Sequence, residues 1–134
     1  MIIAVLFTNG YGRGEGFAVI VVKPLDLAIA DGDPIRAVIR GTAANQDGQT
    51  KGFTQPSSEA QAYLIRSIYR SAGLQLDGAG YVEAHGTGTQ IGDFEETMAL
   101  SKTIASTFSK GQKLIVGSVK PNIGHLEAAV DSRA

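Results

Sequence analysis

The sequence predicts an α/β fold in which short strands alternate with helices and form a mostly parallel sheet. Apolar runs of strand length alternate with helix-like segments along the chain, a pattern typical of parallel sheets. The 134 residues fit one domain, and 43% hydrophobic with 19% charged residues is a globular composition. Seventeen glycines, against a usual share of ~7%, indicate tight turns or close backbone approaches.

The first third of the chain predicts two strands around a short helix. Residues 17–22 are continuously apolar, which is typical of a strand covered on both faces. The turn residues Asp31-Gly-Asp-Pro34 end the helix. The predicted order is a strand over 15–22, a helix over 24–30, a strand over 35–44, and a polar loop over 45–56 with a turn at Asp47-Gly48.

A longer amphipathic helix is predicted next. Ser58 with Gln61 three positions later fits a capping box, and Gly73 fits a helix stop after Ala72. A spacing of four residues predicts an inward face made of Ala60, Leu64 and Ile68.

The remaining sequence predicts two further strand–helix pairs. A strand over 81–84 leads into the glycine loop His85-Gly-Thr-Gly-Thr89. Asp93 with Glu96 fits the cap of a helix that continues to about Phe108. The last strand is predicted over 114–119, with another helix starting from Gly124.

Charge and cysteine content exclude several classes of protein. Twelve basic and thirteen acidic residues give a net charge of −1, so we expect neither nucleic acid nor an anionic membrane as a partner. The apolar segment 1–7 is too short to span a bilayer and lacks the basic flank of a signal peptide. Without cysteine the chain holds neither a disulfide nor a thiolate nucleophile, and we expect a cytoplasmic location.

The two histidines are the main candidates for chemistry. His85 and His125 each follow a predicted strand and lie beside glycines, at the sheet edge where α/β proteins bind ligands. One histidine in such a loop is more often structural, but two at equivalent strand ends favour a functional site. Glycines beside His85 admit a close ligand, and Thr87 and Thr89 supply hydroxyls.

The surroundings of His125 predict a neutral ring. In the first turn of a helix it feels the positive end of the helix dipole, which disfavours the imidazolium form. A neutral ring can donate an N–H to a developing oxyanion. Lys120 and Glu127 flank this histidine and can fix its tautomer.

Two other kinds of site fit the sequence less well. Zinc takes three or four ligands at short spacings, whereas His85 and His125 are forty residues apart and no cysteine is present, so we expect no metal. The glycine segments that begin at Gly10 and Gly86 match neither GxGxxG nor GxxxxGK[ST], which weakens the alternative of an independent phosphate-binding module.

Four motifs resemble the ketosynthase domain of polyketide synthases and the related fatty-acid condensing enzymes. They are Gly10-Tyr-Gly-Arg-Gly-Glu-Gly16, Val38-Ile-Arg-Gly-Thr-Ala-Ala-Asn-Gln-Asp-Gly48, Val82-Glu-Ala-His-Gly-Thr-Gly-Thr89 and Gly117-Ser-Val-Lys-Pro-Asn-Ile-Gly-His-Leu-Glu-Ala-Ala129. The resemblance implies a partial thiolase-like, layered α-β-α fold, spanning the end of its first half and the start of its second. It places a partial ketosynthase domain at 10–130 and leaves 1–9 and 131–134 outside the family pattern.

The resemblance also implies a reaction. In that family a cysteine holds the acyl chain as a thioester, and a malonyl unit on the phosphopantetheine of an acyl carrier protein is decarboxylated before its carbanion attacks. No cofactor is bound, and the domain is usually a homodimer. The implied site residues are His85 and His125 for decarboxylation and the enolate oxygen, Lys120 and Glu127 for the network around the second histidine, and Thr87 and Thr89 for the phosphopantetheine arm, with Asn122 shaping the same loop.

The sequence departs from the family in ways that bear on activity. Phe94 stands where the family has a proline suited to the first helical turn. The nucleophile segment, an Ala-Cys-Ser-like elbow, is expected upstream of the part covered here. We therefore expect a β-ketoacyl synthase segment that is inactive without an intact ketosynthase, or alternatively a non-catalytic remnant that binds carrier protein or an intact synthase. Apolar strands without sheet neighbours also predict poor solubility.

Overall fold

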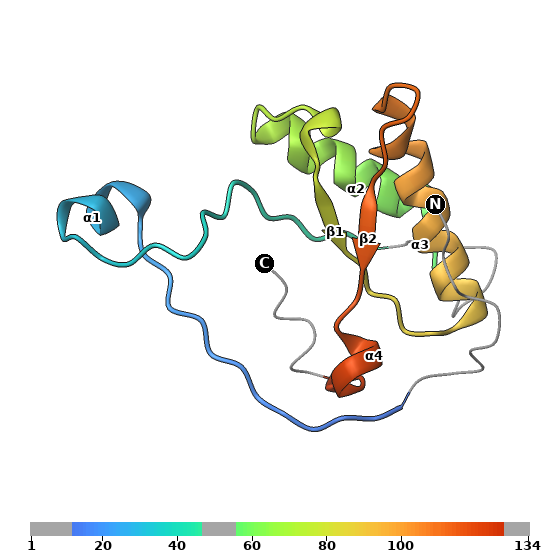
Figure 1. The fold of residues 1–134 in the computed structure, drawn as a ribbon, viewed down its shortest axis with the longest axis horizontal. Helices are drawn as coiled ribbons and strands as arrows, with labels where there is room; N and C mark the ends of the chain where they lie inside the picture. Colours follow the sequence, from blue (N-terminus) through green and yellow to red (C-terminus); the bar gives the residue numbers. More distant parts are fainter. Residues whose placement is uncertain (1–11, 47–55, 128–134) are drawn as a thin grey trace.

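The computed structural model describes residues 12–46 and 56–127 and contains a strand–helix–strand unit with flanking helices (Figure 1). In chain order the helices and strands are α1 (Leu25–Ala30), α2 (Ser58–Ser71), β1 (Tyr81–Glu83), α3 (Gln90–Lys102), β2 (Ile115–Gly117) and α4 (Lys120–Ile123). Two short 3-10 turns, η1 (Leu76–Gly78) and η2 (Ala105–Thr107), follow α2 and α3.

The two strands pair in parallel, so the predicted α/β class is confirmed. Tyr81 lies opposite Ile115, and Glu83 lies opposite Gly117. Two parallel strands need a crossover, and α3 with η2 supplies it. Because both strands run the same way, the loops that follow β1 and β2 leave the sheet at the same edge.

Helices α2 and α3 pack side by side behind the strands (Figure 1). Ala62 of α2 and Ala99 of α3 are almost completely buried, and such small side chains allow two helices to approach closely. The buried hydrophobic residues between 84 and 104, Ala84, Ala99, Leu100 and Ile104, all belong to the strand–helix–strand unit.

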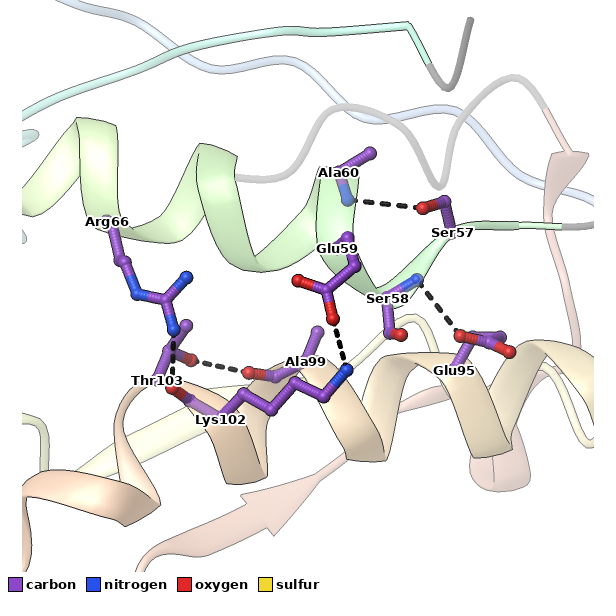
Figure 2. A network of polar contacts seen from close by, with 9 residues as sticks. All are labelled: Ser57, Ser58, Glu59, Ala60, Arg66, Glu95, Ala99, Lys102 and Thr103. Atoms are coloured by element: carbon purple, nitrogen blue, oxygen red, sulfur yellow. Dashed lines mark hydrogen bonds and ion pairs between the residues drawn. The ribbon is translucent and has the colours of Figure 1, made fainter. Parts of the chain in front are cut away.

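Polar contacts tie the same two helices together (Figure 2). The Arg66 guanidinium donates to the Lys102 carbonyl oxygen at 2.7 Å, and the Lys102 ammonium pairs with the Glu59 carboxylate. The Ser58 backbone N–H donates to the Glu95 carboxylate at 3.0 Å. α3 therefore supplies a hydrogen-bond acceptor for the first turn of α2, where main-chain N–H groups lack partners inside the helix.

The predicted boundaries of α2 are nearly right, but its buried face is not the predicted one. The cap is Ser57 rather than Ser58, and the Ser57 hydroxyl accepts from the Ala60 N–H. Gly73 follows the helix with φ +64, as its role as a stop requires. Ser58 and Ala62 form the buried face, since the packing partner is α3, whereas the predicted face of Ala60, Leu64 and Ile68 is only half-buried.

Helix α3 also starts earlier and ends earlier than the sequence predicts. Its N-cap is Thr89, which places Asp93 in the first turn rather than at the cap. The helix ends at Lys102, because Thr103 leaves helical geometry with φ −117 and ψ −92. The hydroxyl of the buried Thr103 donates to the Ala99 carbonyl oxygen at 2.7 Å, so its polar group is satisfied at this break.

The predicted strands over 15–22 and 35–44 do not form. Between residues 12 and 46 the chain is extended around α1, and its one β-bridge joins Arg13 to His125 (Figure 1). Phe17 is 93% exposed and Val21 is 95% exposed. An apolar run becomes a strand only where a neighbour accepts its hydrogen bonds, and the two-stranded sheet does not reach this segment.

The short helix and the turn in this segment are confirmed. Helix α1 covers Leu25–Ala30, and Gly32 adopts φ +69 in the turn that follows. The predicted turn at Asp47-Gly48 lies outside the described residues. Within the described ranges, no helix has the length and apolar character needed to cross a bilayer.

We predict that the exposed apolar run limits solubility. Replacing Phe17 and Val21 with lysine removes the two most exposed apolar side chains of this run and should raise the soluble fraction, because no packing is lost. Ultracentrifugation of lysates and light scattering measure the effect. The matched control places two lysines at the exposed Gln75 and Ser101. An equal gain from the control would show that charge alone, and not the apolar run, governs solubility.

Candidate active site

The two histidine rings meet at the edge of the sheet. The ring centroids of His85 and His125 lie 5.4 Å apart with an interplanar angle of 81°, an edge-to-face arrangement. His85 follows β1 through Ala84, whose N–H extends the strand pairing by donating to the Gly117 carbonyl oxygen at 2.7 Å. The parallel strands thus bring together two side chains that are forty positions apart in the sequence.

The backbone of the first histidine is held by a carboxylate of α3. One oxygen of Glu96 accepts from the His85 N–H at 2.6 Å, and the other accepts from the Gly86 N–H at 2.9 Å. Gly86 has φ +47, and a Cβ there would lie 2.9 Å from the Ser118 Cβ. The loop after β1 therefore packs directly on the loop after β2, and only glycine allows this approach.

The threonine hydroxyls of the glycine loop lie next to each other. Thr87 Oγ1 and Thr89 Oγ1 are 3.0 Å apart and share a hydrogen bond. Between them, the Gly88 N–H donates to both carboxylate oxygens of Asp93, at 3.2 and 3.1 Å. Burial of this carboxyl raises the pKa of Asp93, although the bond from Gly88 opposes the shift.

His125 itself is not helical, and the helix predicted from Gly124 continues into residues that lie outside the described ranges. Helix α4 precedes it and ends at Ile123, and Gly124 with φ +78 turns the chain out of the helix. The backbone of His125 instead forms a parallel bridge, in which the His125 N–H donates to the Gly12 carbonyl oxygen at 2.9 Å and the Gly14 N–H donates to the His125 carbonyl oxygen at 3.0 Å.

A local hydrogen bond sets the tautomer of His125. The Glu127 N–H donates to His125 Nδ1 at 3.0 Å. Because Nδ1 accepts this bond, a neutral ring carries its proton on Nε2. The Nε2–H of such a neutral ring is a hydrogen-bond donor.

Three other predicted residues lie on or next to α4. Lys120 is 7% exposed and starts the helix, and its N–H donates to Ser118 Oγ at 3.3 Å. Asn122 is exposed on the same short helix. The Glu127 side chain forms a 3.6 Å ion pair with Arg13, and both groups are well exposed, so this pair adds little stability.

Two carboxylates of the site were not assigned to it by the sequence. Glu96 fits a capping pattern in the sequence, yet its carboxylate binds the backbone of the histidine loop. Glu83 ends β1 and accepts from the Val119 N–H at 2.6 Å, which connects the first strand to the loop after the second. The sequence signal for Glu96 is a carboxylate in the early turns of a helix that follows a glycine-rich loop, since that loop exposes main-chain N–H groups. Within the described residues, no three His, Cys, Asp or Glu side chains gather as metal ligands do.

The chain belongs to the β-ketoacyl synthase family. The family model described as Beta-ketoacyl synthase, C-terminal domain, matches residues 36–132. This family assignment agrees with the paired strands and the two histidine loops described above.

Fungal polyketide synthases are among the most similar relatives. The partially reducing polyketide synthase tpeA of Talaromyces stipitatus is 62% identical over 122 residues, which cover 90% of this chain and 5% of that protein. The highly reducing polyketide synthase Dhc3 of Alternaria cinerariae is 62% identical over 121 residues, with the same coverage. The chain therefore spans about one twentieth of the length of these curated relatives.

Solved ketosynthases share the fold. The ketosynthase from module 6 of the bacillaene synthase of Bacillus subtilis 168 is 46% identical with a TM-score of 0.72, covering 78% of this chain and 19% of that chain. The ketosynthase from module 1 of the bacillaene synthase of Bacillus amyloliquefaciens FZB42 is 41% identical with a TM-score of 0.70, covering 78% and 20%. The predicted partial thiolase-like fold is confirmed by these structures.

The raised pKa of Asp93 predicts a specific pH dependence. In the folded chain this carboxyl holds its proton more tightly than an ordinary aspartic acid with a pKa of 3.8. Its contribution to stability is therefore lost as the pH rises from 3.8 through the raised pKa of Asp93. Carbon-13 NMR of the Asp93 carboxyl should show a midpoint above 3.8, and the Gly88 amide should shift with the same midpoint. Asp93→Asn should remove the Gly88 titration, whereas Asp77→Asn, at an exposed position, should leave it. A Gly88 amide that titrates unchanged in Asp93→Asn would contradict the assignment.

The close approach at Gly86 predicts a strong effect of alanine. Gly86→Ala combines a positive φ with a clash against Ser118, and we expect it to destabilise the chain by about 2 kcal/mol or more. Gly111→Ala shares the positive φ, at +92, but meets nothing within 4 Å, so about 1 kcal/mol is expected. Urea unfolding followed by circular dichroism measures both. An equal loss of unfolding free energy in the two variants would mean that the loops after β1 and β2 do not pack as described.

Proposed function

We propose that this chain is a ketosynthase segment that supplies the two-histidine side of a decarboxylative Claisen condensation. The observation that carries the proposal is the 5.4 Å contact between the rings of His85 and His125, together with the bond from Glu127 that leaves Nε2 of His125 as a donor. Membership of the β-ketoacyl synthase family and the similarity to polyketide synthases support it.

The chemistry needs donors where negative charge develops. When a malonyl thioester loses carbon dioxide, the breaking carbon–carbon bond leaves its electron pair on the α-carbon, and the charge spreads onto the thioester oxygen. Two neutral imidazoles with N–H groups on one oxygen stabilise that enolate, because fixed donors in a partly dry site need not reorganise. His85 and His125 are both half-buried and close enough to share one oxygen.

The remaining roles follow the same proposal. The adjacent hydroxyls of Thr87 and Thr89 suit the amide groups of a phosphopantetheine arm, since each hydroxyl both donates and accepts. Asn122 lies on the exposed side of α4 and helps to shape the approach of this arm. Lys120 and Glu127 set the electrostatic surroundings of His125. Substrates arrive on an acyl carrier protein in the cytoplasm, and no bound cofactor is needed.

The acyl thioester is formed elsewhere. The printed sequence has no cysteine, so no thiol of this chain can take the acyl group. We propose that the nucleophile belongs to the remainder of a ketosynthase domain, which this chain joins within a homodimeric or otherwise complete synthase. The chain alone is then inactive in condensation.

A second candidate function is a non-catalytic remnant that binds an intact synthase. The exposed apolar residues between 17 and 22 favour it, because such a surface is stable in water only when a partner covers it. In this case the histidine pair is a structural relic.

A hybrid enzyme tests the first function. Residues 36–127 replace the matching segment of the solved Bacillus subtilis ketosynthase, and condensation with a malonyl-carrier protein is followed by mass spectrometry. The hybrid should condense, and His85→Ala or His125→Ala should each lower the rate by about 10² or more, the usual effect of losing a proton-transfer or oxyanion group. If the hybrid folds and neither substitution changes its condensation rate, the proposed role of the histidines is refuted and the non-catalytic remnant is favoured.

The isolated chain gives a second, simpler measurement. With malonyl-carrier protein we expect no acyl adduct on the chain, because the thiol is absent. We also expect little or no release of carbon dioxide, because the histidine pair lacks the remainder of the ketosynthase domain. Intact-mass analysis and a carbon dioxide assay report both. A stable acylated chain would contradict the assignment of the nucleophile to another segment.

A further inference from the structure

Three carboxylates in the first half of α3 bind main-chain N–H groups of other segments. Asp93 accepts from Gly88, Glu95 accepts from Ser58, and Glu96 accepts from His85 and Gly86. Figure 2 shows the Glu95 contact with the first turn of α2. Helix α3 thus lies between α2 and the loop that carries the first histidine.

The contacts of Glu96 fix the orientation of two peptide groups. Its two oxygens accept from two successive N–H groups, at 2.6 and 2.9 Å, so the peptide groups before and after His85 are both held by one rigid carboxylate. Charge-assisted bonds of this length are roughly twice as strong as neutral ones. The orientation of both peptide planes determines the direction in which the His85 Cα–Cβ bond leaves the backbone.

Asp93 adds a second point of attachment further along the loop. Its carboxylate accepts from Gly88, three residues after His85, and both oxygens lie within 3.2 Å of that nitrogen. Gly86 and Gly88 both have positive φ, at +47 and +81, and glycine does not restrict the backbone by itself. The two carboxylates therefore restrain the loop in addition to the hydrogen bond between Thr87 and Thr89.

The orientation of the His85 ring matters because its partner is held independently. The backbone of His125 is fixed by residues 12–14 and by α4, neither of which contacts α3 through a described hydrogen bond. The edge-to-face contact at 5.4 Å is kept only if the loop at 85–88 keeps its position relative to the loop at 118–125.

We propose that Glu96, supported by Asp93, is a positioning residue that aims the His85 ring at His125 through the backbone. The inference rests on the proposed function, since it assigns Glu96 to the geometry of that histidine pair. Glu96 is not a catalytic residue, because its described contacts are with main-chain N–H groups. A glutamine in its place keeps one acceptor but turns an amide NH₂ toward the second N–H, so one of the two bonds is lost.

Glu95 offers a matched control from the adjacent position. It has the same charge and also accepts from a main-chain N–H, and this hydrogen bond is to Ser58 of α2. Glu95→Gln and Glu96→Gln therefore change the charge of α3 equally and release different main-chain N–H groups.

The experiment uses NMR of the full chain with isotope-labelled histidine. In Glu96→Gln the amide exchange protection of either His85 or Gly86, whichever faces the amide NH₂, should fall by about tenfold or more, as expected for losing a hydrogen bond to a charged group. The nuclear Overhauser contacts between the rings of His85 and His125 should weaken, while the amides of α2 and α3 keep their protection. Glu95→Gln should reduce protection at Ser58 and leave the ring contacts intact.

The outcomes separate the positioning role from general stability. Unchanged ring contacts in Glu96→Gln overturn the proposal, as does an equal loss in Glu95→Gln, which would indicate a global effect on α3. If Glu96→Gln unfolds the chain, Asp93→Asn provides the second measurement, with a smaller loss of ring contact expected and an unchanged contact refuting the proposal. This experiment measures ring geometry and not turnover. The proposed role of Glu96 can therefore be refuted even when the hybrid enzyme shows histidine-dependent condensation.

Discussion

The parallel pairing of β1 with β2 is the constraint on which the site depends. Three residues of each strand lie in register, and the bond from Ala84 to Gly117 extends the pairing to the first residue of the histidine loop. Parallel strands deliver their following loops to one edge, whereas an antiparallel pair would send them to opposite edges. The contact between His85 and His125 is a direct consequence of this geometry.

Backbone contacts, more than side-chain packing, hold the two rings. Glu96 holds the first histidine through its N–H and that of Gly86, and residues 12–14 hold the second through a short bridge. This arrangement restrains the main chain on both sides of the ring contact. It also explains why glycine is frequent here, since Gly86 and Gly124 each approach another backbone or side chain too closely for a Cβ.

The exposed apolar segment between 17 and 22 follows from the limited size of the sheet. A strand needs a neighbour for its N–H and C=O groups, and two short strands elsewhere in the chain do not supply one. The solved ketosynthases that share this fold are about five times longer than the matching part of this chain. A segment that is apolar on both faces is suited to the interior of a wider sheet than the described residues form.

The sequence by itself determined the local elements and the identity of the two histidines. The capping and stop signals placed α2 to within a residue, and the short apolar runs located β1 and β2, because such patterns depend on neighbours only a few positions away. The role of Glu96 and the true surroundings of His125 were decided by tertiary structure alone. A carboxylate that binds a backbone eleven residues earlier, and a bridge between Arg13 and His125, depend on how distant segments meet. The predicted strand over 15–22 failed for the same reason, since apolar character is encoded locally but a hydrogen-bonding partner is not.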